Sequence, residues 1–225
     1  MAIFHVATNT PPKSELVEAW LAEQPWGPAD TTGLELVAGF HLDDPDGEVG
    51  MQVFAAQVGD ELFHVPLTYR AEPDAALAHG YLGRMEHSVL GARHVYDGCV
   101  DPCFQMVVAG VAISGYGQAL GFARHDGRWY SVPDEMLIHG HGRIDHRTAV
   151  DGWTTDPAAA DGSLVLANDT LEMTVHRQLV DRPTPASGLS ATWAGQNEPL
   201  VLVEVRSVGQ ERNPPHSARE VEREV

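Results

Sequence analysis

The side chains with the greatest capacity for chemistry gather in one stretch, MEHSVLGARHVYDGCVDPCF, residues 85–104. A thiolate is a strong nucleophile, and the positive end of a helix dipole lowers the pKa of a thiol. Cys103 falls in the first turn of an expected helix, so it is a candidate nucleophile if His87 or His94 supplies a base beside it. The alternative, which the sequence favours, is a buried cysteine without a catalytic role.

Five further candidate residues of the same stretch lie on two expected strands that meet at Leu90-Gly91. These residues are Glu86, His87, Arg93, Tyr96 and Asp97. Buried charges need partners, so an Arg93–Asp97 or Glu86–His87 pair that holds the hairpin to the following helix is one interpretation. A polar pocket for a small ligand, lined by the same residues, is the other. The sequence favours the structural interpretation.

The segment LIHGHGRIDHR, residues 137–147, offers the best set of metal ligands. His139 and His141 are two positions apart, so on a strand both imidazoles face the same side and can share zinc or another transition metal. Asp145 and His146 would complete the set from the following turn. The alternative is an exposed strand with a polar face, in which the glycines between the histidines mark a turn.

Motifs for the commonest enzyme reactions are missing from the sequence. It has no G-x-x-x-x-G-K-[ST] loop, no G-x-S-x-G elbow and no strand–turn–helix unit with G-x-G-x-x-G. Lys13, the only lysine, lies on an expected N-terminal helix, a poor position for the phosphate-binding lysine of a kinase. DDPDGE, residues 43–48, lacks the acid spacing of an EF-hand and predicts a hairpin turn. These features argue against an enzyme.

Composition sets the class of protein. The chain has 225 residues, 43% of them apolar, which is enough for a hydrophobic core. Its net charge of −18 argues against nucleic acid or an anionic membrane as a partner. No apolar run is long enough to span a membrane, the first residues are unlike a signal peptide, and two cysteines cannot build a disulfide scaffold. We therefore expect a cytoplasmic protein.

The elements that must position these side chains predict an α+β fold. Apolar spacing and end signals predict helices near residues 10–25 and 101–117. Three strand-like segments joined by short turns predict an antiparallel meander, and strands alone are expected after the second helix. The meander strands are expected at 34–42, 48–58 and 61–70. The chain is expected to divide into a first domain, a β-rich part packed on it and a disordered charged tail, at 1–130, 131–208 and 209–225.

Several segments, taken in order, resemble the maltokinase N-terminal cap domain family. The first is a G-x-M-E-H-S-x-L-G turn followed by V-Y-D-G and by D-P at the head of a helix. MAIFHVATNTPPKSELVEAWLAEQPW, DPDGEVG and HVPLTYR are similar to other parts of that family. LSATWAGQNEPLVLVEV resembles the ending of a stand-alone branch whose members lack the kinase lobes. The resemblance covers most of residues 1–118 and a short C-terminal piece.

The resemblance implies a fold and a metabolic setting, and no catalytic residue. In maltokinase-like enzymes the cap has a curved antiparallel sheet and precedes the kinase lobes, which phosphorylate maltose or amino sugars and feed trehalose and α-glucan metabolism. We therefore expect a non-catalytic accessory or binding protein that works with a sugar kinase, a sugar or a sugar phosphate. Two alternatives stay open: a metal-dependent enzyme centred on His139 and His141, and a structural homo-oligomer paired through exposed sheet edges.

Overall fold

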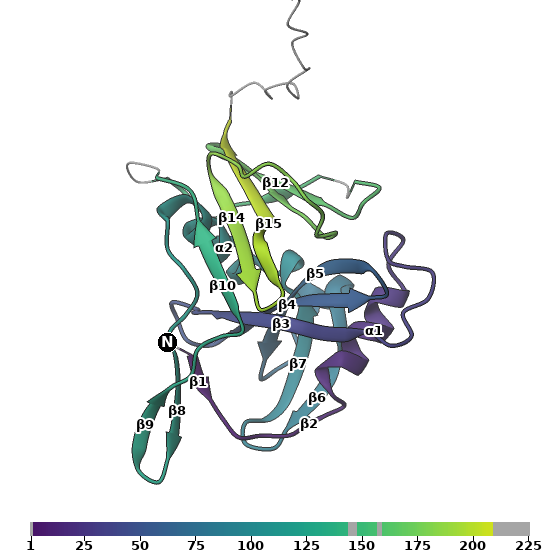
Figure 1. Cartoon of the computed structure of the whole chain (residues 1–225), viewed down its shortest axis with the longest axis vertical. Helices are drawn as coiled ribbons and strands as arrows, with labels where there is room; N and C mark the ends of the chain where they lie inside the picture. Colours follow the sequence, from purple (N-terminus) through teal and green to yellow (C-terminus); the bar gives the residue numbers. More distant parts are fainter. Residues whose placement is uncertain (1, 144–147, 157–158, 209–225) are drawn as a thin grey trace, which may run out of the picture.

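A computed structural model of the chain describes residues 2–143, 148–156 and 159–208 (Figure 1). Strands account for 45% of the structure and helices for 16%. The fold is therefore mostly β, and the expected α+β class fits in its coarser sense, as sheets accompanied by two main α-helices. The predicted tail, residues 209–225, lies outside the described residues. No helix in the described ranges is long and apolar enough to cross a membrane.

The first sheet contains the predicted meander and the predicted hairpin. Its six antiparallel strands are β2 (Asn9–Thr10), β3 (Glu35–Leu42), β4 (Gly50–Val58), β5 (Glu61–Arg70), β6 (Tyr81–His87) and β7 (Gly91–Asp97). They lie in the order β2-β6-β7-β5-β4-β3. Gly59, in the β4–β5 turn, has a φ of +57°, which glycine adopts without a steric penalty. The sheet curls, because β6 and β7 run obliquely to β3 (Figure 1).

Both faces of the first sheet are buried. Successive side chains of a strand point to opposite faces, and β4 is apolar on both. Val53 and Ala55 join one core, while Phe54 and Ala56 join a second core on the other face. Helix α1 (Lys13–Ala22) covers the second core, with buried side chains that include Leu21. This double burial explains why β4 lacks the polar alternation of a strand with one wet face.

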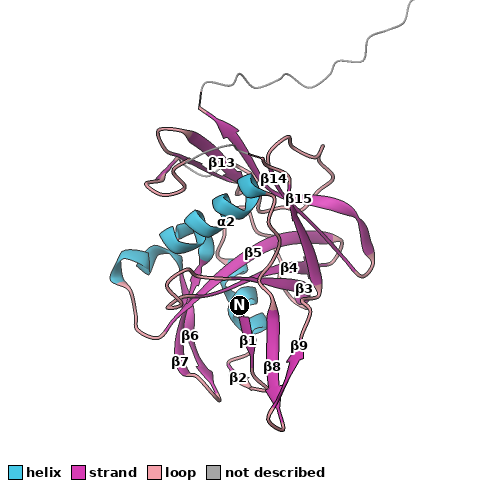
Figure 2. Cartoon of the chain, turned by 90° about the vertical axis from the view of Figure 1, so that its left-hand side faces the viewer, coloured by secondary structure: helices cyan, strands magenta, loops and turns pink. Residues whose placement is uncertain are grey.

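Helix α2 (Pro102–Ser114) covers the other face of the first sheet. The Asp101 carboxylate accepts a hydrogen bond from the Cys103 N–H at 3.0 Å, Pro102 occupies the first turn, and Gly115 ends the helix with a φ of +74°. These are the predicted end signals: Asp101 satisfies one free backbone N–H, Pro102 lacks another, and Gly115 adopts the left-handed conformation that ends a helix. Figure 2 shows α2 between the first sheet and a second one.

The second sheet comes from the C-terminal part of the chain. Its strands are β10 (Met136–Gly140), β11 (Thr154–Thr155), β12 (Leu164–Ala167), β13 (Leu171–Val175), β14 (Gly188–Trp193) and β15 (Gln196–Ser207). All neighbouring pairs are antiparallel, in the order β10-β14-β15-β13-β12-β11. One hydrophobic core unites this sheet, α2 and the first sheet. The division of the chain near residue 130 stays a prediction.

Three short strands and two short 3-10 helices are the remaining described elements. A small sheet joins β1 (Ala2–Phe4) to the hairpin of β8 (Gly121–His125) and β9 (Arg128–Ser131), which projects from the body in Figure 1. Two short 3-10 helices, η1 (Ala75–Gly80) and η2 (Gly98–Val100), flank the β6–β7 hairpin. The chain passes from β1 in the small sheet to β2 in the first sheet, so the N-terminal segment bridges two sheets.

Candidate functional site

The five polar residues predicted as a site lie on or at the end of the β6–β7 hairpin, but they do not converge. Glu86 forms an ion pair with Arg84 at 2.5 Å, and both side chains are more than half exposed. His87 Nδ1 instead accepts the backbone N–H groups of Val89 and Leu90, at 3.3 and 3.1 Å. The predicted Glu86–His87 pair is therefore wrong: the Glu86 carboxylate forms a surface ion pair, and the His87 imidazole accepts hydrogen bonds from the backbone of the β6–β7 turn.

Asp97 pairs with a residue that local sequence patterns do not connect to it. Its buried carboxylate accepts a hydrogen bond from Arg177, which follows β13, and another from the Cys99 N–H at 3.1 Å. The Arg177 guanidinium carbon lies 5.5 and 5.4 Å from the ring centroids of Trp20 and Trp26. The predicted Arg93–Asp97 pair is therefore wrong. Asp97 instead ties the C-terminal part of the chain to the first sheet.

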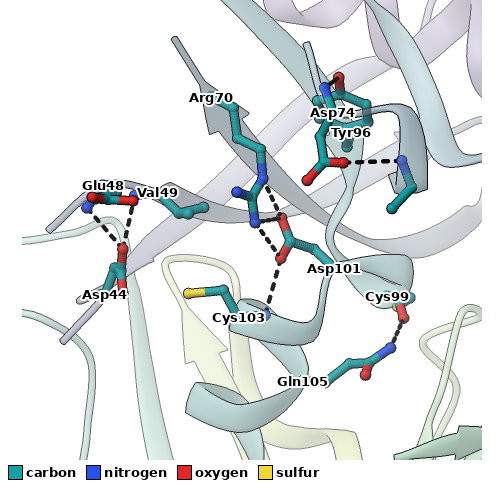
Figure 3. A network of polar contacts seen from close by, with 11 residues as sticks. Asp44, Glu48, Val49, Arg70, Asp74, Tyr96, Cys99, Asp101, Cys103 and Gln105 are labelled. Atoms are coloured by element: carbon teal, nitrogen blue, oxygen red, sulfur yellow. Dashed lines mark hydrogen bonds and ion pairs between the residues drawn. The ribbon is translucent and has the colours of Figure 1, made fainter. Parts of the chain in front are cut away.

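The rest of the stretch 85–104 forms a structural network (Figure 3). The buried Asp101 carboxylate caps α2 and also accepts hydrogen bonds from two nitrogens of Arg70, from Nη2 at 2.8 Å and from Nε at 3.1 Å. Tyr96 accepts the Asp74 N–H on its hydroxyl oxygen at 2.8 Å. Gln105 donates from its side-chain amide to the Cys99 carbonyl at 2.7 Å. This network holds β5, β7, η1 and the start of α2 together.

Cys103 is unsuited to act as a nucleophile. Its thiol lies on the side of Asp44 in Figure 3, and burial, followed by this carboxylate, raises its pKa to about 12. The Asp44 carboxylate also accepts the backbone N–H groups of Glu48 and Val49, both at 2.8 Å, which confirms the predicted hairpin turn. The alternative in which the helix dipole lowers the Cys103 pKa is wrong, because burial and a nearby negative charge outweigh the dipole. Burial also raises the pKa of Cys99.

The predicted metal ligands are only partly within the described structure. His139 is exposed on β10, whereas His141 follows the last residue of that strand and its Nε2 lies 2.7 Å from Ser190 Oγ. Burial, then the neighbouring His139, lowers the His141 pKa. Asp145 and His146 lie outside the described residues. Within the described ranges, no three His, Cys, Asp or Glu side chains form a metal-binding group, so the metal site stays a prediction.

Sequence reasoning did not predict a polar group that forms around His176 in the C-terminal part of the chain. His176 Nε2 lies 3.0 Å from Glu204 Oε1, and its Nδ1 lies 3.4 Å from Ser163 Oγ. The carbonyl of His176 accepts a hydrogen bond from Nδ1 of His64, a fully buried residue of β5, at 2.9 Å. Ser163 is itself buried, at 5% exposure, so a substrate has no access to its hydroxyl. We assign this group to the joint between the two sheets.

A cavity of about 670 Å³ is the best-formed candidate site. It opens between the N-terminal segment, the first residue of α1, the β3–β4 turn and the β6–β7 hairpin. We call it the Lys13 pocket. Its lining includes Asn9, Lys13, Gln52, Tyr69, His87 and Arg93. Two residues of the predicted site, His87 and Arg93, therefore line one cavity, while Glu86, Tyr96 and Asp97 do not contribute to it.

Lys13 is the residue of this pocket that sequence reasoning underrated. Its ammonium donates to Gln52 Oε1 at 2.5 Å and lies 5.3 and 5.7 Å from the ring centroids of Tyr69 and Phe54. Burial lowers the Lys13 pKa to about 8. No local sequence pattern indicates this contact, because Lys13 and Gln52 are 39 residues apart in the chain.

Among the other polar groups of the pocket, His87 has a pKa that the Lys13 charge helps to lower, and two atoms have no hydrogen-bond partner among the described residues. Burial, followed by the positive charges of His5, Lys13 and Arg93, lowers the His87 pKa. The Tyr69 hydroxyl and the Asn9 Oδ1 are shielded from solvent, and neither has a hydrogen-bond partner among the described residues. Burial raises the Tyr69 pKa, so the phenol keeps its proton and is a hydrogen-bond donor. The pocket lining thus combines the cationic side chains of Lys13 and Arg93 with carboxylates of the β3–β4 turn and with hydrogen-bonding atoms that have no partner among the described residues.

Comparison with known proteins finds a family similarity over one segment of the chain. Residues 20–101 match the family model of the maltokinase N-terminal cap domain. The match runs from α1 to the cap of α2 and contains the meander and the β6–β7 hairpin. It confirms the resemblance inferred from the sequence and leaves the second sheet outside. The search of curated proteins found no match.

Proposed function

We propose that this protein is a non-catalytic accessory protein of sugar metabolism that acts with a sugar kinase. The observation that carries the proposal is the match of residues 20–101 to the maltokinase N-terminal cap domain. In maltokinase-like enzymes the cap precedes the lobes that transfer phosphate. The 225 residues of this chain contain a cap-like part and a second sheet, and they lack phosphate-binding loops of the nucleotide-binding type. An accessory protein of this kind requires a cap-like domain but does not itself need the residues that transfer phosphate.

We expect the kinase to contact the β8–β9 hairpin. Both faces of the first sheet are already covered by α1 and α2, so a partner must use edges, turns or projecting elements. The hairpin carries Trp129 and Tyr130 at 56% and 49% exposure, with the Arg124 guanidinium carbon 5.8 Å from the Trp129 ring centroid. Aromatic residues and arginine are enriched at protein–protein interfaces and supply much of their binding energy.

A binding measurement with a capless kinase tests the proposal. The full chain is titrated into a maltokinase from which its own cap has been removed, and a complex is expected. The double variant Trp129→Ser/Tyr130→Ser is expected to bind at least tenfold more weakly. Tyr116→Ser is the control, since Tyr116 is 72% exposed and lies outside the hairpin. Failure of the wild-type chain to bind any such kinase would overturn the accessory role.

An activity assay tests the link to maltose, trehalose and α-glucan metabolism. The rate at which the capless kinase phosphorylates maltose is measured with and without the protein. An accessory protein is expected to raise this rate or to increase the kinase's thermal stability, because it binds the folded kinase and not the unfolded one. Equal rates and equal melting temperatures at saturating protein would contradict the proposal.

A further inference from the structure

Two positive charges of the Lys13 pocket have no ion-pair partner among the described residues. Lys13 is half-buried and its ammonium contacts the Gln52 carbonyl oxygen and two aromatic rings. Arg93 is half-buried and donates to the carbonyl of Ala92 at 2.7 Å. Within the described part of the chain, neither side chain forms an ion pair with a carboxylate. Both belong to a chain with a net charge of −18, where carboxylates are abundant.

The absence of such an ion pair matters because removing a charge from water has a cost. Buried charges in proteins are paired or hydrogen-bonded, and an unpaired one shifts its pKa toward the neutral form. Lys13 follows this rule, since burial lowers its pKa to about 8, but at neutral pH it remains mostly charged. Its charge and that of Arg93 both act on His87, so they influence one region of the pocket. An anion in this region would gain from both.

Neutral groups of the pocket also lack partners within the described ranges. The Tyr69 hydroxyl offers a proton and the Asn9 Oδ1 offers a lone pair, and both atoms are shielded from solvent. Buried polar atoms without partners are rare in proteins and call for an explanation. A ligand that carries hydroxyl groups both donates and accepts hydrogen bonds, so it can satisfy both atoms.

The two sides of the pocket differ in charge. The β3–β4 turn contributes carboxylates, including Asp44 and Glu48, and in the sheet order it is separated from Arg93 by β5. Asp44 is engaged by backbone N–H groups of its own turn, whereas Glu48 is exposed. A ligand with one anionic end and a hydroxylated body matches this arrangement, with the anion toward Arg93 and Lys13 and hydroxyls toward the turn.

From this arrangement we propose that the Lys13 pocket binds a small polyhydroxylated anion, of the class of sugar phosphates and sugar acids, with Lys13 and Arg93 as its charge-recognising residues. Phosphate and carboxylate groups share the chemistry that recognises them here, namely a negative charge that accepts several hydrogen bonds. The inference goes beyond the kinase partnership proposed above and does not depend on it. The pocket, at about 670 Å³, is far larger than a phosphate ion, so the ligand needs a further part, and hydroxyl groups on that part would pair with the polar atoms of the lining.

Thermal unfolding and calorimetric titration of the full chain test this inference with four probes. They are glucose 6-phosphate, gluconate, glucose and inorganic phosphate. A ligand at about a hundred times its dissociation constant is expected to raise Tm by about 5 to 11 °C for a protein of this size. Glucose 6-phosphate or gluconate is expected to produce such a shift, and which of them binds more tightly decides between phosphate and carboxylate.

Charge variants identify the site of binding. Lys13→Met and Arg93→Gln are each expected to weaken binding about tenfold or more, while Lys13→Arg keeps most of the affinity because it retains the charge. Arg124→Gln is the matched control, since Arg124 lies on the β8–β9 hairpin outside the pocket. Tm without ligand is recorded for every variant, so that loss of binding is separated from loss of folding.

Each outcome decides for or against the proposal. A charged sugar that binds wild type and Lys13→Arg, but binds Lys13→Met and Arg93→Gln weakly, supports it. Equal binding of glucose and glucose 6-phosphate would overturn the anionic part, and equal binding of inorganic phosphate and glucose 6-phosphate would overturn the hydroxylated part. Silence with all four probes, or equal losses in Arg124→Gln, would overturn the site itself.

Discussion

Removal of either partner of the Arg177–Asp97 pair is expected to destabilise the protein strongly. Both side chains are almost fully buried, at 5% and 8% exposure, and they join the C-terminal part of the chain to the first sheet. Arg177→Met leaves the Asp97 carboxylate buried without its cation, and Asp97→Asn leaves the guanidinium without its anion. Breaking one side of a buried pair typically costs about 3 to 5 kcal/mol, which is a large fraction of the roughly 5 to 15 kcal/mol that stabilises a typical domain.

The asparagine variant isolates the charge. The amide oxygen that Asp97→Asn introduces can still accept the Cys99 N–H, which the carboxylate accepts at 3.1 Å, so the connection to η2 is kept. Arg177→Met keeps an unbranched side chain of similar reach beside Trp20 and Trp26. The loss measured for each variant is therefore dominated by the unpaired charge that remains. The double variant leaves neither charge, so it is expected to be more stable than the sum of the two losses predicts, by about 1.5 to 3 kcal/mol.

Urea unfolding followed by tryptophan fluorescence measures these losses. With a slope of about 2 to 3 kcal/mol per molar urea, a loss of 3 to 5 kcal/mol lowers the midpoint by about 1 to 2.5 M. Arg84→Met is the control, because Arg84 pairs with Glu86 where both side chains are more than half exposed, and such pairs contribute about 0 to 1 kcal/mol. Losses below about 1 kcal/mol for both single variants, or strict additivity in the double variant, would refute the reasoning.

Three further predictions concern other buried polar groups. Burial lowers the His64 pKa to about 3, so below about pH 6.5 the unfolded chain binds a proton that the folded chain does not, and the free energy of unfolding falls by about 1.4 kcal/mol per pH unit because of this residue. In denaturant titrations of His64→Asn, the free energy of unfolding should fall between pH 7 and pH 5 by about 2 kcal/mol less than in wild type. An equal fall in both proteins would contradict this prediction. Asp101→Ala removes the α2 cap and leaves Arg70 unpaired, so calorimetry should record a Tm lower by about 4 to 12 °C, from about 2 to 3 kcal/mol; a shift below about 2 °C would argue against the network. Cys103 should react with a thiol reagent at pH 8 far more slowly than a free cysteine, and Asp44→Asn should accelerate the reaction; rates equal to free cysteine would show that the thiol is not held in its neutral form.

The features that the sequence predicted correctly are those whose signals are local. The strands β3, β4 and β5 fall within the expected ranges, because the turns that separate them, at Pro45 and Gly59, are formed by residues within a short stretch of chain. The ends of α2 could equally be predicted from the sequence, since Asp101, Pro102 and Gly115 act on the backbone of the helix itself. The hairpin of β6 and β7 was also predicted, and residues 20–101 carry the resemblance that the family match confirms.

The pairings within the site could not be predicted in this way. Sequence reasoning paired Asp97 with Arg93, four residues away, whereas its partner in the fold is Arg177, eighty residues along the chain. The Lys13–Gln52 contact likewise joins α1 to β4. Side chains four residues apart on a strand share a face but lie well apart along it, so the choice of partner depends on which distant element packs against that face.

The sequence by itself indicated the two main helices, the meander and hairpin of the first sheet, the cap-like segment at residues 20–101 and the residues capable of chemistry, because propensity, turn residues and capping are properties of a short stretch of chain. The tertiary structure alone decided which of these residues meet. It buried Asp97 against Arg177 and placed Cys103 beside Asp44. It also brought Lys13 and Arg93 into one cavity, where neither forms an ion pair with a carboxylate of the described residues. The physical reason is that charge pairing and pKa depend on burial and on long-range contacts, which exist only when the sheets and helices have packed together.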